Sequence, residues 1–124
     1  MKRVSIDRQI YAFSTAMEPA AHVAPGEQVL FESQDALGGQ VKAETDILSD
    51  LDFTRINPAT GPVYVQGAEP GDTLVVRVLS IDCAPSGAIV TGPGLGVLGE
   101  EMTRHATRIL PVEGGAVVFD GLRL

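Results

Sequence analysis

Residues 57–72 read Asn57-Pro58-Ala59-Thr60-Gly61-Pro62-Val63-Tyr64-Val65-Gln66-Gly67-Ala68-Glu69-Pro70-Gly71-Asp72, and this stretch decides how the rest of the chain is organised. It places three prolines and three glycines around one short apolar triplet. Proline fixes φ and lacks an N–H, whereas glycine accepts positive φ, so the turns in this stretch are specified by the sequence. Such turns either hold polar groups at set positions or set the register of the strand that follows.

The strand expected to follow is residues 73–82, which contain the longest apolar run in the chain, Leu74 to Ile81. As a strand it would span roughly 30 Å, at about 3.3 Å per residue. Both of its faces are apolar except for Arg77, and a strand of that kind is covered on both sides. The sequence therefore predicts either a two-layer domain with this strand at its centre or a domain that docks on further protein.

The remaining segments predict short strands separated by turns. Alternation and apolar runs indicate strands around Val4–Ile6, Gln28–Ser33, Ala88–Thr91, Arg104–Val112 and Ala116–Phe119, the last two joined as a hairpin. Residues 45–53 have apolar positions at helical spacing after a capping residue and predict one helix of about two turns. The expected fold is a single mainly β domain over residues 1–124, a two-layer β-sandwich or a partly open barrel with one short helix.

Composition narrows the classes of partner. The 124 residues have a formal net charge of −7, and only 5% are aromatic. An acidic chain with few stacking surfaces repels phosphate backbones, so we expect no nucleic acid as a partner. No window approaches the roughly 20 apolar residues of a membrane span, so we expect no membrane contact. The single cysteine, Cys83, excludes an internal disulfide and fits a reducing compartment, so we predict a cytoplasmic location.

Residues 94–99 match the pattern G-x-G-x-x-G. A dinucleotide site needs this pattern between a strand and a helix, so that the helix N-terminus meets the pyrophosphate. Here a Gly-Pro pair precedes it, and Glu100 and Glu101 follow with charges that would repel phosphate. We therefore predict a flexible glycine loop.

The residue types of a blue-copper site are also present, as His22, Cys83, Met102 and His105. Three of the four copper ligands usually cluster on one loop, and Cys83 lies far from His105 in the sequence. We therefore expect no metal site in this chain, with Cys83 a packed small residue and His105 a strand residue with an ordinary partner. No serine lies in a G-x-S-x-G context, so no nucleophile is predicted either.

The polar residues of the opening stretch are Asn57, Thr60, Glu69 and Asp72. In a structural interpretation they cap and brace turns through side-chain hydrogen bonds to the backbone. In a functional interpretation they wall a polar pocket for a small ligand. The residues alone leave both open.

Residues 57–65 and 67–74 closely resemble the signature of the acetamidase/formamidase family. Three further parts of the chain are similar to that family's N-terminal region, at residues 18–27, 31–40 and 92–99. The resemblance implies hydrolysis of small aliphatic amides, such as formamide or acetamide, to a carboxylate and ammonia. Family members are more than twice this length, and their presumed metal and catalytic groups lie in the second half. The chain thus resembles the N-terminal half alone. Three explanations are open: it is one subunit of a split enzyme, a fragment of a longer protein, or a stand-alone domain with a changed role.

The resemblance also implies site residues and partners. We expect Asp35, Asn57 and Thr60 to bind the substrate, with Gly61 and Pro62 shaping the pocket wall, and the catalytic residues to lie in the absent C-terminal half. A divalent metal, zinc or calcium, is compatible with the complete enzyme and is not expected to be bound by this chain alone. The implied partners are a small amide, a second polypeptide supplying the C-terminal half, and further copies in a homo-oligomer. The alternative is a non-catalytic β-domain that binds a partner or assembles an oligomer.

Overall fold

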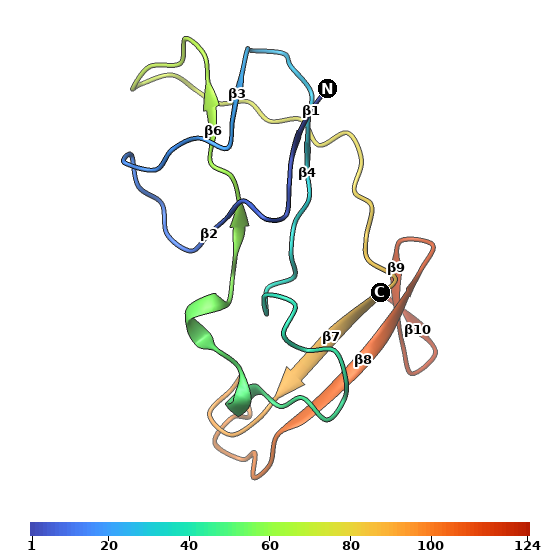
Figure 1. Ribbon diagram of the computed structural model, residues 1–124. Coiled ribbons are helices and arrows are strands. Elements are labelled where there is room, and N and C mark those ends of the chain that lie inside the picture. The colour runs from blue at the N-terminus through green and yellow to red at the C-terminus, as the bar shows by residue number, and fades with distance from the viewer. The chain divides into compact units, whose positions relative to one another are not determined.

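The computed structural model describes all residues, 1–124, and its regular structure is mainly β, as predicted (Figure 1). The chain divides into two compact units, and each combines segments that are separate in sequence. Unit 1 consists of Met1–Gly38 and Phe53–Arg77, and unit 2 consists of Gly39–Asp52 and Val78–Leu124. The single domain over residues 1–124 stays a prediction.

Unit 1 is built from three pairs of short strands. Strand β1 (Lys2–Val4) pairs in parallel with β4 (Val29–Phe31), and β3 (Ala21–Val23) pairs in parallel with β6 (Val63–Val65). Strand β2 (Gln9–Ile10) pairs antiparallel with β5 (Ala59–Thr60). Each pair joins distant parts of the sequence. The buried apolar side chains of this unit, Val4 and Val23, lie on β1 and β3.

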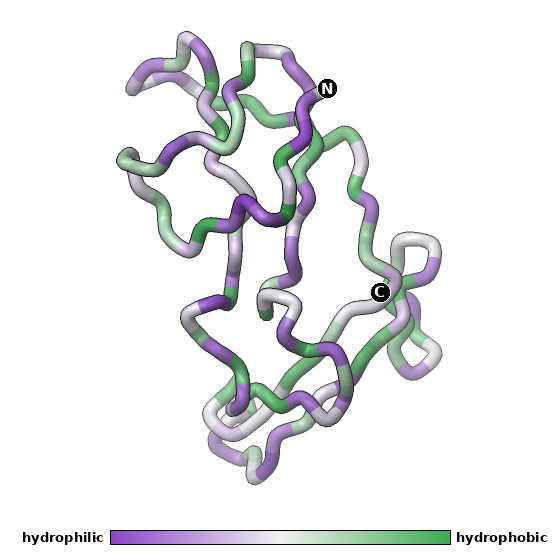
Figure 2. Tube along the Cα trace, in the orientation of Figure 1, coloured by the Kyte–Doolittle hydropathy of each residue, from purple (hydrophilic) through white to green (hydrophobic).

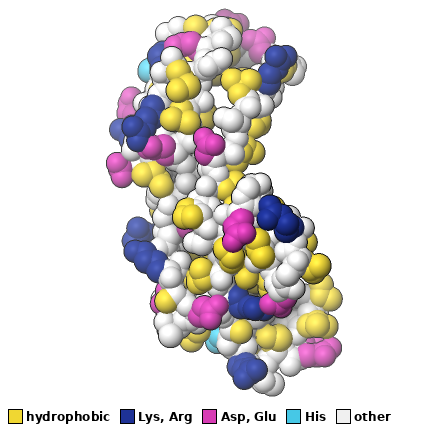
Figure 3. Space-filling view, turned by 90° about the vertical axis from the view of Figure 1, so that its right-hand side faces the viewer, with side chains coloured by type: hydrophobic (Ala, Val, Ile, Leu, Met, Phe, Trp, Pro, Cys, Tyr) yellow, Lys and Arg dark blue, Asp and Glu magenta, His cyan; other side chains and the backbone are white.

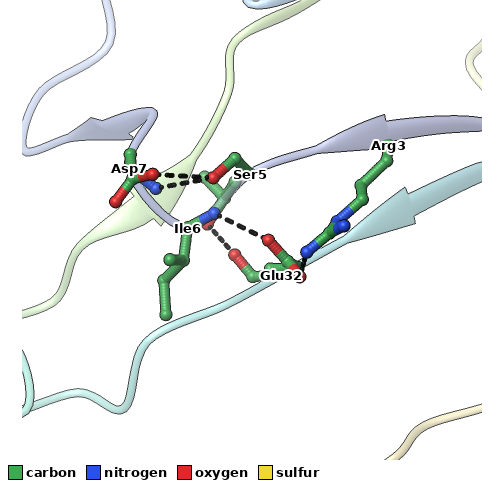
Figure 4. Close-up of polar contacts among 6 residues, drawn as sticks. Arg3, Ser5, Ile6, Asp7 and Glu32 are labelled. Carbon is green, nitrogen blue, oxygen red and sulfur yellow. Dashed lines mark hydrogen bonds and ion pairs between the residues drawn. The ribbon is translucent and has the colours of Figure 1, made fainter.

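A charged contact supports the pairing of β1 with β4. Figure 4 shows the Glu32 carboxylate between the Arg3 guanidinium and the backbone of Ile6, whose N–H donates to it at 3.3 Å. The backbone N–H of Glu32 also donates to the carbonyl of Val4, at 3.1 Å. The hydrogen bond from Arg3 is the main cause that lowers the pKa of Glu32, and the Ile6 N–H adds to it. Glu32 is therefore an ionised structural group that ties the two strands together.

Unit 2 contains one antiparallel sheet in the order β10-β9-β8-β7, formed by β7 (Ser86–Thr91), β8 (Ala106–Glu113), β9 (Ala116–Phe119) and β10 (Leu122–Arg123). The hairpin predicted between β8 and β9 is confirmed, and Gly114 and Gly115 take the positive φ that its turn requires. Thr107 on β8 is buried, and its hydroxyl donates to the carbonyl of Asp46 at 2.5 Å. This contact fixes the residue 39–52 segment on the sheet.

The predicted helix over residues 45–53 does not form. Two 3-10 turns stand in this region, η1 (Leu48–Asp50) and η2 (Phe53–Arg55). The carboxylate of Asp46 accepts from the N–H groups of Lys42 and Ala43, at 2.8 and 2.9 Å, so it caps the preceding turn and not a helix. These bonds also lower the pKa of Asp46. Ile47 is extended, with φ −113° and ψ 153°, and provides no side-chain cap for the residues after it.

The strand predicted over residues 73–82 is also wrong. This part of the chain, here called the unpaired segment, runs between β6 and β7 without belonging to any sheet (Figure 1). Most of it is coloured as hydrophobic in Figure 2. Its large aliphatic side chains are at least 64% exposed: Leu74, Val75, Val76, Val78, Leu79 and Ile81. A strand exists only where another strand completes its hydrogen bonds, and no strand of this chain does so here.

Other apolar groups are exposed as well. Figure 3 shows hydrophobic side chains lying open among the charged ones on the face that it draws. Cys83, predicted to be packed, is exposed and unbonded. Neither 3-10 turn has the length or the apolar run that a membrane-crossing helix requires.

Candidate functional site

The five residues predicted to bind substrate all lie in unit 1, on two neighbouring pieces of chain. The N–H of Asn57 donates to the carbonyl of Ala36 at 2.7 Å, and the Thr60 hydroxyl donates to the carbonyl of Glu32 at 2.7 Å. Residues 57–60 therefore run alongside residues 32–36 in the opposite direction. This brings the chain around Asp35 next to the chain that carries Asn57 and Thr60.

Asp35 and Asn57 have different local roles. The carboxylate of Asp35 accepts from the N–H of Leu37 at 2.8 Å, and its carbonyl accepts from Gly38 at 2.9 Å, so Asp35 braces the turn after β4. Asn57 takes φ 51°, in the left-handed region that asparagine tolerates better than most residues. Its side-chain amide is exposed and makes no hydrogen bond. Asn57 thus has an amide available to a ligand, in contrast to the Thr60 hydroxyl, whose proton is committed.

Gly61 and Pro62 connect β5 to β6 along the chain. The N–H of Gly61 donates to the carbonyl of Arg8 at 2.9 Å, and the carbonyl of Pro62 accepts from Ala20 at 2.7 Å. Gly61 is buried at φ 145°, a conformation that residues with a Cβ rarely adopt, and the peptide bond to Pro62 is cis. Glycine at position 61 accommodates this φ, because it has no Cβ.

Pro62 lines an open cleft of about 320 Å³ in unit 1. The other lining residues are Ile10, Phe13, Ser14, Thr15 and Met17. The cleft is mainly apolar, with two hydroxyl groups on its wall. Of the five predicted residues only Pro62 lines it, so the structure does not gather all five around one cleft. Sequence reasoning missed Ser14 and Thr15, because nothing local distinguishes them from ordinary loop residues.

The glycine loop predicted at residues 94–99 is confirmed as a loop. It is closed by hydrogen bonds from the N–H of Gly94 to the carbonyl of Gly99, at 2.9 Å, and from Gly99 to Gly96, at 3.2 Å. No helix follows, and Glu100 and Glu101 line the adjoining cavity of about 390 Å³. An acidic cavity without a helix N-terminus does not suit a pyrophosphate.

His105 departs from its prediction. It lies just before β8, and its Nδ1 is buried without a hydrogen-bond partner. The ring packs against Gly92 so closely that a Cβ there would lie 2.2 Å from Nδ1. Only glycine fits at position 92, and no sequence pattern indicated this contact.

No group of three or more His, Cys, Asp or Glu side chains converges in the structure. Zinc and calcium sites in proteins need several such donors around one point. The residues of this chain therefore do not fit a divalent-metal site by themselves.

The chain belongs to the Acetamidase/Formamidase family, whose model matches residues 9–117. It is 34% identical over 103 residues to an acetamidase of Mycolicibacterium smegmatis, covering 82% of this chain and 24% of that protein. It is 38% identical over 63 residues to a formamidase of Methylophilus methylotrophus, covering 49% of this chain and 16% of that protein.

Among solved structures, an acetamidase from Bacillus halodurans is similar with a TM-score of 0.93 at 40% sequence identity. That match covers 98% of this chain but 42% of the acetamidase. The chain thus spans about a quarter or less of the curated relatives' length and less than half of that solved acetamidase.

Proposed function

We propose that this chain is the N-terminal part of an amidohydrolase that converts small aliphatic amides, such as formamide and acetamide, to a carboxylate and ammonia. In that reaction the oxygen of water bonds to the amide carbon, the C–N bond breaks, and the nitrogen leaves with a proton. The observation that carries the proposal is the match of 98% of the chain to an acetamidase structure at a TM-score of 0.93. The cytoplasm is its proposed location, in keeping with a single free cysteine.

The contribution proposed for this chain is substrate binding by Asp35, Asn57, Thr60, Gly61 and Pro62. The exposed Asn57 amide can donate to an amide carbonyl and accept from an amide N–H. The cleft beside Pro62 offers apolar surface to a short alkyl group. Hydrolysis further requires an activated water and donors for the tetrahedral oxyanion. We assign those groups to a C-terminal part, held on the same or on a second polypeptide.

The test combines this chain with the part of an acetamidase that the match leaves out, and measures ammonia release from formamide and acetamide. We expect turnover from the combination and none from either component alone. Asn57→Ala should weaken turnover, whereas Gln66→Ala, an exposed change in the same stretch, should not. A combination that assembles fully and releases no ammonia from either amide would contradict the proposal.

The second candidate function is a non-catalytic β-domain that binds a partner or forms a homo-oligomer. The exposed aliphatic side chains of the unpaired segment favour it, because large apolar patches commonly mark protein contacts. This function predicts a chain that is folded and of one defined size on its own, which sedimentation measures. It also predicts that assembly with an acetamidase fragment adds no hydrolysis.

A further inference from the structure

The unpaired segment, residues 73–82, has the side chains of a buried strand and none of a strand's hydrogen bonds. Six large aliphatic residues flank Arg77, and each is at least 64% exposed. No residue from Thr73 to Ala84 makes a hydrogen bond through its backbone or its side chain, and the next bonded group is the carbonyl of Pro85. A run of this length with both apolar faces and both backbone edges open is rare in a folded protein.

The backbone of the segment is ready to pair. None of residues 73–82 is proline, so every one offers both an N–H and a C=O group. No residue between Gly71 and Gly94 takes a positive φ, and no turn hydrogen bond closes within the segment. A strand laid beside it could therefore complete a sheet without first breaking any hydrogen bond of the segment.

Comparison with the solved acetamidase indicates what covers it. The structural match includes 98% of this chain, which is too much to leave out a ten-residue segment. The same match reaches only 42% of the acetamidase, so more than half of the larger protein lies outside it. The acetamidase that shares this fold therefore has additional chain available to cover the segment.

We infer that the unpaired segment is the docking strand for the remaining region of an acetamidase/formamidase chain. A strand of that region pairs with its backbone, and apolar side chains of that region cover its two faces. This is strand addition to an open edge, in which main-chain bonds give affinity and alternate side chains give specificity. The inference rests on the proposed function, since it takes its partner from the family match.

A second copy of this chain is a poorer occupant. Each copy carries a net charge of −7, so two copies repel each other. Self-pairing would supply one edge partner while adding only the same two-faced segment, which leaves apolar faces uncovered. The larger remaining region can supply both the edge and the cover.

The test uses the full 124-residue chain and, as its probe, a tagged polypeptide made of the Bacillus halodurans acetamidase region outside the match. The two are coexpressed, purified through the tag, and examined by native mass spectrometry and amide hydrogen exchange. We expect a one-to-one complex in which exchange within residues 73–82 slows by at least about tenfold relative to the chain alone. Where the probe does not fold by itself, it is fused to the C-terminus of this chain, and the same segment is compared between the fusion and the chain.

Two variants separate docking from folding. Val76→Asp places a charge on a side chain that is 74% exposed, so it should leave the chain's own circular dichroism and urea midpoint unchanged. In the complex that charge would be buried, so affinity should fall by about a hundredfold or more. Val97→Asp is the matched control, since Val97 is fully exposed in the glycine loop, and its complex should bind as the unchanged chain does.

The outcomes distinguish this inference from the proposed function. Protection of residues 73–82 without ammonia release upholds docking and contradicts the amidase proposal. Ammonia release from a complex whose residues 73–82 still exchange freely overturns docking and leaves the amidase proposal standing. Self-association of the chain alone with protection of the same residues also overturns the inference, because the occupant is then a second copy.

Discussion

Residues 57–72 and the unpaired segment are neighbours in sequence and opposite in character. The first is rich in turns and polar groups, yet its backbone is tied to Arg8, Ala20 and Ala36, and its Thr60 hydroxyl to Glu32. The second consists mostly of aliphatic residues, yet it makes no hydrogen bond and leaves its aliphatic side chains exposed. The comparison shows that the hydropathy of a segment indicates whether its side chains favour burial. Its hydrogen bonds show whether other residues of this chain pair with it.

The difference has a physical cause. A turn is specified by the conformations of a few consecutive residues, so glycine and proline fix it within the stretch itself. A strand depends on a second strand that can lie anywhere, on this chain or on another. Substitutions in the two regions should therefore differ in their effect on stability.

Replacing one buried and one exposed valine by alanine compares how much each region contributes to the stability of the isolated chain. Val4 is 1% exposed on β1, and Val4→Ala should lower the free energy of unfolding by about 2–3 kcal/mol through lost burial and a cavity. Val76 is 74% exposed, and Val76→Ala should change the free energy of unfolding by less than about 0.5 kcal/mol. Urea denaturation of the two variants gives both values. Equal losses would show that the unpaired segment is already covered in the isolated chain.

Gly61 tests how firmly the turns are specified. Its φ of 145° is unfavourable for a residue with a Cβ, although the added Cβ would meet only the N of Val63 at 3.5 Å. Gly61→Ala should therefore cost about 2 kcal/mol through backbone strain. Gly87→Ala is the control, because Gly87 has no positive φ and open space around it. If both variants melt at the same temperature, position 61 does not hold this conformation in solution.

Thr60 tests the tie between the two pieces of chain at the candidate site. Thr60→Val removes the hydroxyl that donates to Glu32 and should cost about 1 kcal/mol, whereas Thr60→Ser should keep most of the stability. Ser80→Ala in the unpaired segment removes a hydroxyl without a partner and should have no measurable effect. Urea denaturation measures the free energy of unfolding of each variant. If Ser80→Ala lost as much stability as Thr60→Val, the stabilising role assigned to the Thr60 hydrogen bond would be contradicted.

The smallest effect concerns pH. The hydrogen bond from Arg3 and the Ile6 N–H lower the pKa of Glu32 in the folded chain. Its contribution to stability is therefore fully present above the unfolded pKa of about 4.3, and it is lost as the pH falls through the lower, folded value. Glu32→Gln should be less stable than the unchanged chain at pH 7, with a difference that shrinks in acid.

Exposed Glu69, which makes no ion pair, is the control for this pH effect. Glu69→Gln should follow the unchanged chain at every pH. The measurement is urea unfolding between pH 7 and pH 3. A Glu32→Gln difference that stays constant with pH would refute the assigned ion pair.

The parts of the fold that could be predicted are those that depend on local residues. The β8–β9 hairpin follows from two apolar runs around Gly114-Gly115, and β4 falls inside the strand predicted at residues 28–33. The helix predicted at residues 45–53 failed because Asp46 is used by the preceding turn. The strand at residues 73–82 failed because its apolar pattern contains no information about which chain covers it.

The assignment of five residues to substrate binding stays a prediction, and only their positions in the fold can be compared with the sequence. The Asn-Pro-Ala-Thr-Gly-Pro pattern located Asn57 and Thr60, and the structure places them beside the chain around Asp35. Placing Pro62 in a cleft with Ser14 and Thr15, or His105 against Gly92, requires contacts between residues far apart in sequence. A single sequence, taken by itself, contains no signal for such contacts.

The unpaired segment also bears on how readily the chain aggregates. Apolar, proline-free windows of five to seven residues with high β-propensity readily stack into aggregates. Arg77 interrupts this window, so the longest purely aliphatic stretches are Leu74–Val76 and Val78–Leu79. A single charge of this kind acts as a gatekeeper, and here it is the only ionised side chain between Asp72 and Asp82. Arg77 therefore interrupts amyloid-like stacking of the segment wherever its aliphatic side chains are exposed.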